Sequence, residues 1–302
     1  MDLSYIINEL GEDRETYQGS VSPPIFQSSN FCFSDVKAMR NALTHEMDVP
    51  FYSRGHNPTV AILRKKLAAL AGSEDALVFG SGAAAIAAAV MSQLKAGDHV
   101  VSVQKPYLWT NKLLKKLLER FGVSTTFVDG RDPQDWEAAA KPETKVFLME
   151  SPNSMTFDLQ DIPAVVAIAQ AKGIITVLDN SFATPLNQRP IEMGVDITCH
   201  SASKYLAGHS DMIAGVLCTS HRLAKQIFAG EYMTLGGILP ANEAWLLLRG
   251  LRTLPLRMER VATSTPKVVA FLEDHPMIKE VIYPFSPSFP QFDLAQKQME
   301  RP

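Results

Sequence analysis

The chain has 302 residues, of which 46% are hydrophobic and 20% are charged, and its formal net charge is −3. This balance is typical of a soluble globular protein with one large domain and part of another. The small net charge and the lack of a basic run argue against a nucleic-acid or membrane-surface partner. The three cysteines are predicted to be reduced core residues: Cys32, Cys199 and Cys218.

The first fifty residues carry few signals of folded structure. The sequence begins MDLSYIINEL, with no basic region before its apolar residues, so we do not expect a secretory signal. The longest small-apolar run, 83–91, is too short to span a bilayer, and we predict a cytoplasmic protein. Residues 1–50 lack a hydrophobic period and hold Pro23 and Pro24, which predicts an extended arm of the kind that oligomers use.

A capped helix is predicted after the motif YSRGHNPT at 52–59. Asn57 can cap this helix, and Pro58 suits its first turn. Apolar residues then recur at helical spacing until Gly72, where the helix should end. Considered alone, Arg54 of this motif is typical of a solvated loop arginine.

A glycine motif follows the short apolar strand predicted at 76–79. Gly80 and Gly82 flank Ser81, and an alanine-rich helix comes next. Backbone amides can approach a ligand closely here, and the positive end of the helix points to the same place, which predicts a phosphate site. The letters also fit a dinucleotide pattern, but Asp98 precedes the next strand rather than ending it, which disfavours a nicotinamide cofactor.

Strands that alternate with helices between residues 77 and 219 predict a doubly wound, mostly parallel sheet with helices on both faces. Polar residues follow these strands where ligands gather in such sheets. Tyr107 follows the strand 99–103 and precedes an amphipathic helix at 111–121. Glu150 ends the strand 146–149.

Asp179 ends the buried strand 174–178, and the next strand, 196–200, leads into Ser201, Ser203 and Lys204. A second apolar strand at 213–219 follows, so we expect Lys204 to be pressed between core strands, where desolvation favours the uncharged amine. Such an amine forms a Schiff base with an aldehyde, most often that of pyridoxal phosphate. A lone loop lysine is usually solvated, but the hydroxyls could hold a phosphate and Asp179 a pyridine nitrogen.

Two segments carry a family resemblance: LDNSFATPLNQRP from Leu178, and DITCHSASKYLAGHSDMIAG around Lys204. They resemble the cysteine and methionine metabolism enzymes that use pyridoxal 5'-phosphate, which include cystathionine gamma-synthase, cystathionine lyases and methionine gamma-lyase. The resemblance implies fold type I, this cofactor, and elimination or replacement at the beta or gamma carbon of a sulfur-containing amino acid. It does not choose among these reactions.

The resemblance also implies catalytic roles. Lys204 forms the internal Schiff base and later acts as base at the alpha carbon. Asp179 keeps the pyridine nitrogen protonated, and Tyr107 stacks on the ring. The family asparagine that contacts the ring hydroxyl falls on Ser154, with Asn153 one place early.

The phosphate ligands that the resemblance implies come from two subunits. Within the chain they are the amides of Gly82 and Ala83, which add to the hydroxyls of Ser201 and Ser203 already noted; Ala83 replaces a usual methionine but would bind through its backbone. Tyr52 and Arg54 are implied to reach the cofactor phosphate of a neighbouring subunit in a homodimer or homotetramer. Arginine suits this role because its planar fork can hold phosphate at two places.

The chain departs from the family at the substrate side, where Leu108 and Trp109 replace small residues and should reshape the pocket. We predict a cofactor domain at 51–239 and the start of a smaller C-terminal α/β domain at 240–302, with helices at 241–249 and 254–274 and a strand at 279–283. The family continues beyond this point, and its arginine for the substrate carboxylate is expected there. The alternatives are an aminotransferase of the same fold, or a shortened chain that binds cofactor without catalysis.

Overall fold

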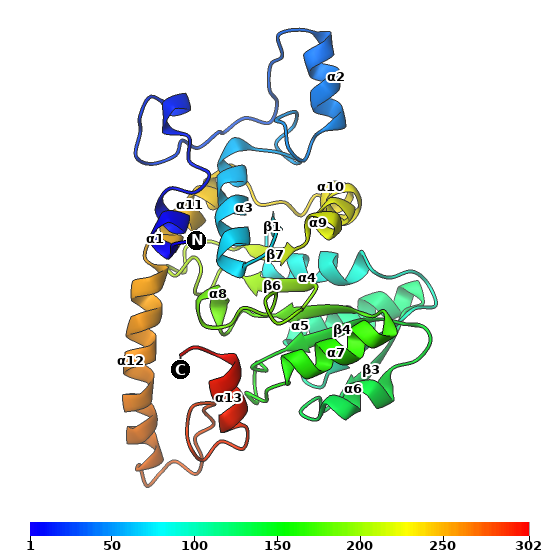
Figure 1. Cartoon of the computed structure of the whole chain (residues 1–302), viewed down its shortest axis with the longest axis vertical. Coiled ribbons are helices and arrows are strands. Elements are labelled where there is room, and N and C mark those ends of the chain that lie inside the picture. The colour runs from blue at the N-terminus through cyan, green and yellow to red at the C-terminus, as the bar shows by residue number, and fades with distance from the viewer. Residues whose placement is uncertain (302) are drawn as a thin grey trace.

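A seven-stranded sheet forms the centre of the computed structural model, which describes residues 1–301 (Figure 1). Its strand order is β1-β7-β6-β5-β4-β2-β3. The strands are β1 (Asp75–Phe79), β2 (His99–Val103), β3 (Ser124–Val128), β4 (Thr144–Glu150), β5 (Ile175–Asp179), β6 (Ile197–Ser201) and β7 (Gly215–Thr219). Strands β3, β2, β4, β5 and β6 run parallel, whereas β7 is antiparallel to β6 and β1. The prediction of a mostly parallel sheet is confirmed.

Helices cover both faces of the sheet, because its central strands are apolar on both sides. Strand β4 illustrates this: Val146 and Leu148 pack into one core cluster, and Phe147 and Met149 pack into another on the opposite face. One face is covered by α4 (Gly82–Met91), the helical segment 108–121 and α9 (His221–Ile227). The other is covered by α3 (Pro58–Ala71), α6 (Pro133–Ala139), α7 (Ile162–Lys172) and α11 (Ala241–Leu251).

The local signals for helix α3 act as predicted. The Asn57 side chain accepts a hydrogen bond from the Thr59 N–H at 3.0 Å, and Pro58 begins the helix. Gly72 ends it with φ 70°, a left-handed conformation that glycine adopts without a steric penalty.

The helix predicted at 111–121 starts earlier and is not α-helical throughout. It consists of α5 (Leu108–Lys112), the π-helical turn η2 (Leu113–Leu117) and the 3-10 turn η3 (Leu118–Phe121).

The expectation of an extended arm is wrong for parts of residues 1–50. These residues include α1 (Leu3–Asn8), the 3-10 turn η1 (Arg14–Tyr17) and α2 (Val36–Thr44). Ile6 and Ile7 are buried against α3. The buried Lys66 amine anchors this segment, because it bonds both of their carbonyls at 3.2 Å and the Glu12 carboxylate at 3.0 Å. Helix α2, by contrast, projects away from the sheet (Figure 1).

The two predicted C-terminal helices are present as α11 and α12 (Leu254–Glu273), but residues 279–283 do not form a strand. A strand requires backbone partners, and the sheet of residues 1–301 ends at β1 and β3. The remaining helices are α8 (Thr184–Asn187), the π-helical turn η4 (Phe228–Tyr232), α10 (Met233–Leu235) and α13 (Phe292–Gln298). Cys199 and Cys218 are buried, but Cys32 is exposed, contrary to our expectation. No helix within residues 1–301 is long and apolar enough to cross a membrane.

Candidate active site

A pocket of about 550 Å³ lies where strands β4, β5 and β6 end, beside the first turn of α4. Most of the predicted site residues line this pocket: Gly82, Ala83, Tyr107, Ser154, Asp179, Ser201, Ser203 and Lys204. Parallel strands bring their carboxyl ends to one edge of a sheet, which explains why residues far apart in sequence meet here.

Asp179 is held by the residue two places after it. The Ser181 hydroxyl donates to Asp179 Oδ1 at 2.6 Å, and the Ser181 N–H donates to the same oxygen at 3.0 Å. Burial raises the pKa of Asp179 above its ordinary value, although these hydrogen bonds and the Lys204 charge oppose the shift. A cationic group in the pocket would therefore be a favourable partner for this carboxylate.

Ser181 also accepts the Ser201 N–H at 2.6 Å, so one hydroxyl joins the ends of β5 and β6. We did not single out Ser181 from the sequence. The sequence did contain a signal for this contact, because a serine stands two residues after the aspartate. At that spacing an aspartate side chain commonly accepts a hydrogen bond from the backbone N–H of the later residue.

Lys204 does not lie pressed between core strands, so our expectation of a desolvated lysine is wrong. Its side chain is exposed at the pocket, because Ala202, Leu206 and Ala207 occupy the buried positions of the same turn. The Lys204 amine lies 5.6 Å from the centre of the Tyr107 ring. The structure thus places this amine beside an aromatic ring, in the pocket that Asp179 also lines.

The first turn of α4 approaches Ser201 closely. A Cβ atom on Gly82 would lie 2.9 Å from both Cα and Cβ of Ser201, so a larger residue there would displace backbone. The Ser81 side chain caps the helix by accepting the Ala84 N–H at 3.1 Å. The N–H groups of a helix start and a nearby hydroxyl suit a phosphate. The Ser203 hydroxyl is already engaged, because it accepts the Ala214 N–H at 2.9 Å.

Glu150 is the register partner of Asp179 on the neighbouring strand. Its Oε2 accepts the Tyr107 N–H at 2.8 Å, and its Oε1 accepts the Ser154 N–H at 2.6 Å. Burial and the charge of Asp179 raise the pKa of Glu150. Ser154 lines the pocket, whereas Asn153 is buried and bonds Thr156, so the structure supports Ser154 as the position that faces a ligand.

The sequence model of the Cys/Met metabolism PLP-dependent enzymes matches residues 5–302. The chain belongs to this family. It is 40% identical to L-methionine gamma-lyase of Pseudomonas deceptionensis over 94% of the chain and 72% of that protein. It is 38% identical to a probable cystathionine gamma-synthase of Herpetosiphon aurantiacus over 99% of the chain and 92% of that protein.

A solved structure agrees with this membership. The crystal structure of cystathionine gamma-lyase from Lactobacillus plantarum, complexed with L-serine, superposes with a TM-score of 0.92 at 35% identity. The superposition covers 100% of this chain and 76% of that chain. Members of the family depend on pyridoxal 5'-phosphate, and this pocket fits such a group. It offers a helix start with hydroxyls for the phosphate, a carboxylate for a ring nitrogen, a tyrosine ring and a lysine.

At the two positions where the chain departs from the family, only one side chain lines the pocket. Trp109 does so, with the Lys112 amine 4.2 Å from the centre of its ring. Leu108 is exposed outside the pocket lining, so our expectation that it shapes the pocket is wrong. Leu108 and Trp109 begin a helix, on which consecutive residues face different directions. Phe182, Tyr205 and Ile213 add apolar surface that we did not predict.

Tyr52 and Arg54 do not reach the pocket of their own chain. Both are exposed and line a separate hollow with residues 26–29 and 238–241. The Arg54 guanidinium carbon lies 5.3 Å from the centre of the Tyr52 ring.

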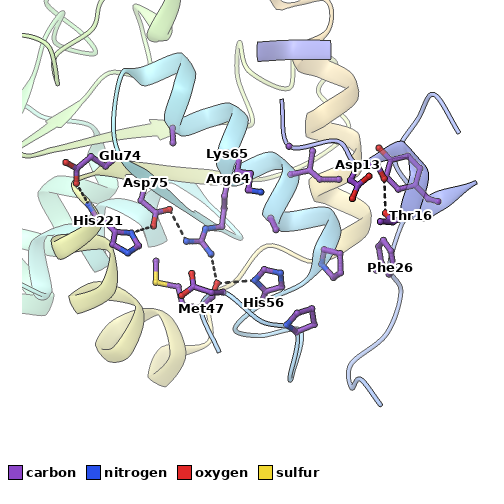
Figure 2. A pocket seen from close by; sticks show the side chains of 18 residues that line it. Asp13, Thr16, Phe26, Met47, His56, Arg64, Lys65, Glu74, Asp75 and His221 are labelled. Carbon is purple, nitrogen blue, oxygen red and sulfur yellow. Dashed lines mark hydrogen bonds and ion pairs between the residues drawn. The ribbon is translucent and has the colours of Figure 1, made fainter. Parts of the chain in front are cut away.

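A larger pocket of about 640 Å³ lies along α3 (Figure 2). There Arg64 donates to the Met47 carbonyl at 3.2 Å and to the Asp75 carboxylate at 2.9 Å. His221 contacts the same carboxylate at 3.1 Å, and His56 contacts the Met47 carbonyl at 3.1 Å. These five residues form what we call the Arg64 cluster. Because their polar groups pair with one another, we interpret the cluster as a structural support for residues 45–58 rather than as the family site.

Proposed function

We propose that this chain catalyses pyridoxal-phosphate-dependent elimination or replacement at the beta or gamma carbon of a sulfur-containing amino acid, such as cystathionine, methionine or cysteine. The observation that carries the proposal is the meeting of Lys204 and Asp179 in one pocket with the first turn of α4. The names of the similar proteins support the class of substrate.

Each pocket residue then has a binding role. The Lys204 amine would hold the cofactor through its aldehyde carbon, and the Asp179 carboxylate would face its ring nitrogen. The amides of Gly82 and Ala83 and the Ser201 hydroxyl would hold its phosphate at the helix end of the pocket. Ser203 lines the same end, and its hydroxyl would have to give up its bond to the Ala214 carbonyl to donate to the phosphate. The Tyr107 ring would stack on the cofactor ring, and Ser154 would lie near the ring hydroxyl.

When bound, the cofactor supplies an electron-withdrawing ring that stabilises negative charge at the substrate's alpha carbon. The residues of the chain supply the proton transfers and the electrostatic setting. Once the substrate amino group has replaced it, the free Lys204 amine can take the proton from the alpha carbon. Asp179 opposes loss of the ring-nitrogen proton, because an adjacent carboxylate favours the cationic form of that nitrogen.

We further propose that the site is completed by a second subunit in a homodimer or homotetramer that works in the cytoplasm. Tyr52 and Arg54 lie outside the pocket of their own chain, with their side chains exposed. An exposed arginine next to a tyrosine ring can bind a phosphate that a neighbouring subunit presents.

A product assay tests the proposal. Purified protein supplied with pyridoxal 5'-phosphate should release a thiol from methionine or cystathionine, or hydrogen sulfide from cysteine, without an added keto acid. An aminotransferase would release no thiol and would need a second amino acceptor. Lys204→Ala should abolish the release, and Lys116→Ala, which changes an exposed lysine of η2, should not. Thiol release by Lys204→Ala at the wild-type rate would overturn the assignment.

A further inference from the structure

We propose that Glu150 is a positioning residue, whose two carboxylate oxygens hold the loops that carry Tyr107 and Ser154 at the cofactor. The proposal rests on the proposed function, because it concerns the same pocket. Glu150 is the last residue of β4 and is 5% exposed. It contributes to the pocket lining, but its oxygens are directed to backbone N–H groups.

One carboxylate joins segments that are distant in sequence. Oε2 accepts from Tyr107, which lies 43 residues earlier, and Oε1 accepts from Ser154, four residues later. Each oxygen serves a different loop, so both bonds require a side chain of this length with two acceptors. The two backbone N–H groups favour the ionised carboxylate and so oppose the effect of burial on the pKa of Glu150, and hydrogen bonds to an ionised acceptor are stronger than neutral ones.

The Tyr107 ring depends on this link. Tyr107 is 41% exposed, so packing alone does not fix the direction of its ring. Tyr107 is also the first residue before α5, with φ −42° and ψ 138° and no side-chain cap on the helix. The Glu150 bond to its N–H is therefore a contact that sets where the ring stands relative to Lys204 and Asp179.

The position of Glu150 is electrostatically unfavourable, which is unexpected for a residue that only stabilises the fold. It stands in register with Asp179, and two carboxylates side by side repel each other. A glutamine would avoid the repulsion but would present an NH₂ group to one of the two N–H donors. A carboxylate at this position is therefore explained by its ability to accept from both loops, which outweighs the repulsion. A cationic cofactor ring in the pocket would lessen the repulsion between the two carboxylates.

The test compares Glu150→Gln with Glu143→Gln, which makes the same change at an exposed glutamate before the other end of β4. In the holoenzyme, Glu150→Gln should release pyridoxal 5'-phosphate about tenfold faster, as expected when one charge-assisted hydrogen bond is lost. The circular dichroism band of the bound cofactor should also shrink, because the Tyr107 ring loses its fixed direction. Glu143→Gln should match wild type in both measurements.

A merely structural Glu150 would lower the melting temperature while leaving the release rate and the cofactor band unchanged, and that result would overturn the proposal. Glu150→Asp supplies a second measurement, since it keeps the charge but is too short to reach both loops. With ¹⁵N-tyrosine labelling, only seven tyrosine amides are observed. The Tyr107 amide resonance should shift in this variant, and an unchanged resonance would also contradict the proposal. If wild-type protein takes up no cofactor, the proposed function fails, whereas the Tyr107 resonance still reports the Glu150 contact.

Discussion

The pocket at the strand ends and the Arg64 cluster use charge in opposite ways. In the cluster, Asp75 lies between Arg64 and His221, so the charges are matched within the chain. In the strand-end pocket, Asp179 and Glu150 stand side by side, and the Lys204 side chain is exposed to the cavity. Matched charges stabilise a fold, whereas unmatched charges in a pocket require a ligand to complete them. The larger pocket is therefore not the better candidate for the reaction.

The largest effect should come from changing one aspartate in each region. Asp179→Asn should retain some cofactor but lower turnover by about 10²–10³, as when a preorganised electrostatic group is removed. Asp75→Asn should leave turnover per folded site near wild type but lower the free energy of unfolding by about 1–3 kcal/mol, because Arg64 loses an ionic partner. Steady-state kinetics and urea unfolding measure the two effects. Wild-type turnover in Asp179→Asn would show that the strand-end pocket is not where the reaction takes place.

Mixing two inactive variants tests whether the pocket is completed by a neighbour. Lys204→Ala and Arg54→Ala should each be impaired alone. If Arg54 acts across an interface, hybrids formed by subunit exchange contain one site with both residues intact, and activity should recover up to that one site. If Arg54 serves its own chain, every site still lacks one residue and activity stays low. Exchange is checked separately by mass spectrometry of differently labelled subunits.

A smaller effect is expected at the apolar side of the strand-end pocket. Trp109→Gly should change the ratio of turnover among cystathionine, methionine and cysteine by about tenfold, because reshaping an apolar pocket alters discrimination by a few kcal/mol at most. Leu108→Gly is the matched control, since Leu108 lies next in sequence but outside the lining. Equal ratios in both variants and wild type would place the Trp109 side chain away from the substrate.

The smallest effect should appear in the Arg64 cluster as a dependence of stability on pH. Burial lowers the pKa of His56 below its ordinary value near 6.5. The unfolded chain therefore binds a proton more readily, and the contribution of His56 to stability should decline as the pH falls below that value. His56→Asn can still donate to the Met47 carbonyl but does not titrate. Its unfolding free energy should fall less than that of wild type on acidification, and parallel curves would contradict this account.

Local signals in the sequence determined much of the fold and the position of the site. Asn57, Pro58 and Gly72 bound α3 as predicted, because caps and proline act within a few residues. The apolar run that ends at Asp179 forms β5, and the glycine motif before α4 lines the pocket. These features depend on short-range geometry and on the rule that parallel strands end at one edge.

Tertiary structure decided what each side chain faces. Lys204 is exposed because other residues of its turn are buried, and a prediction from its two flanking strands missed this. Residues 279–283 have strand-like composition but no partner among the seven strands. Glu150 bonds Tyr107 from 43 residues away, and Arg64 joins Met47 to Asp75. The burial of these side chains and their hydrogen-bond partners depend on segments that meet only after folding. A short stretch of neighbouring residues therefore does not reveal which partner each side chain will have.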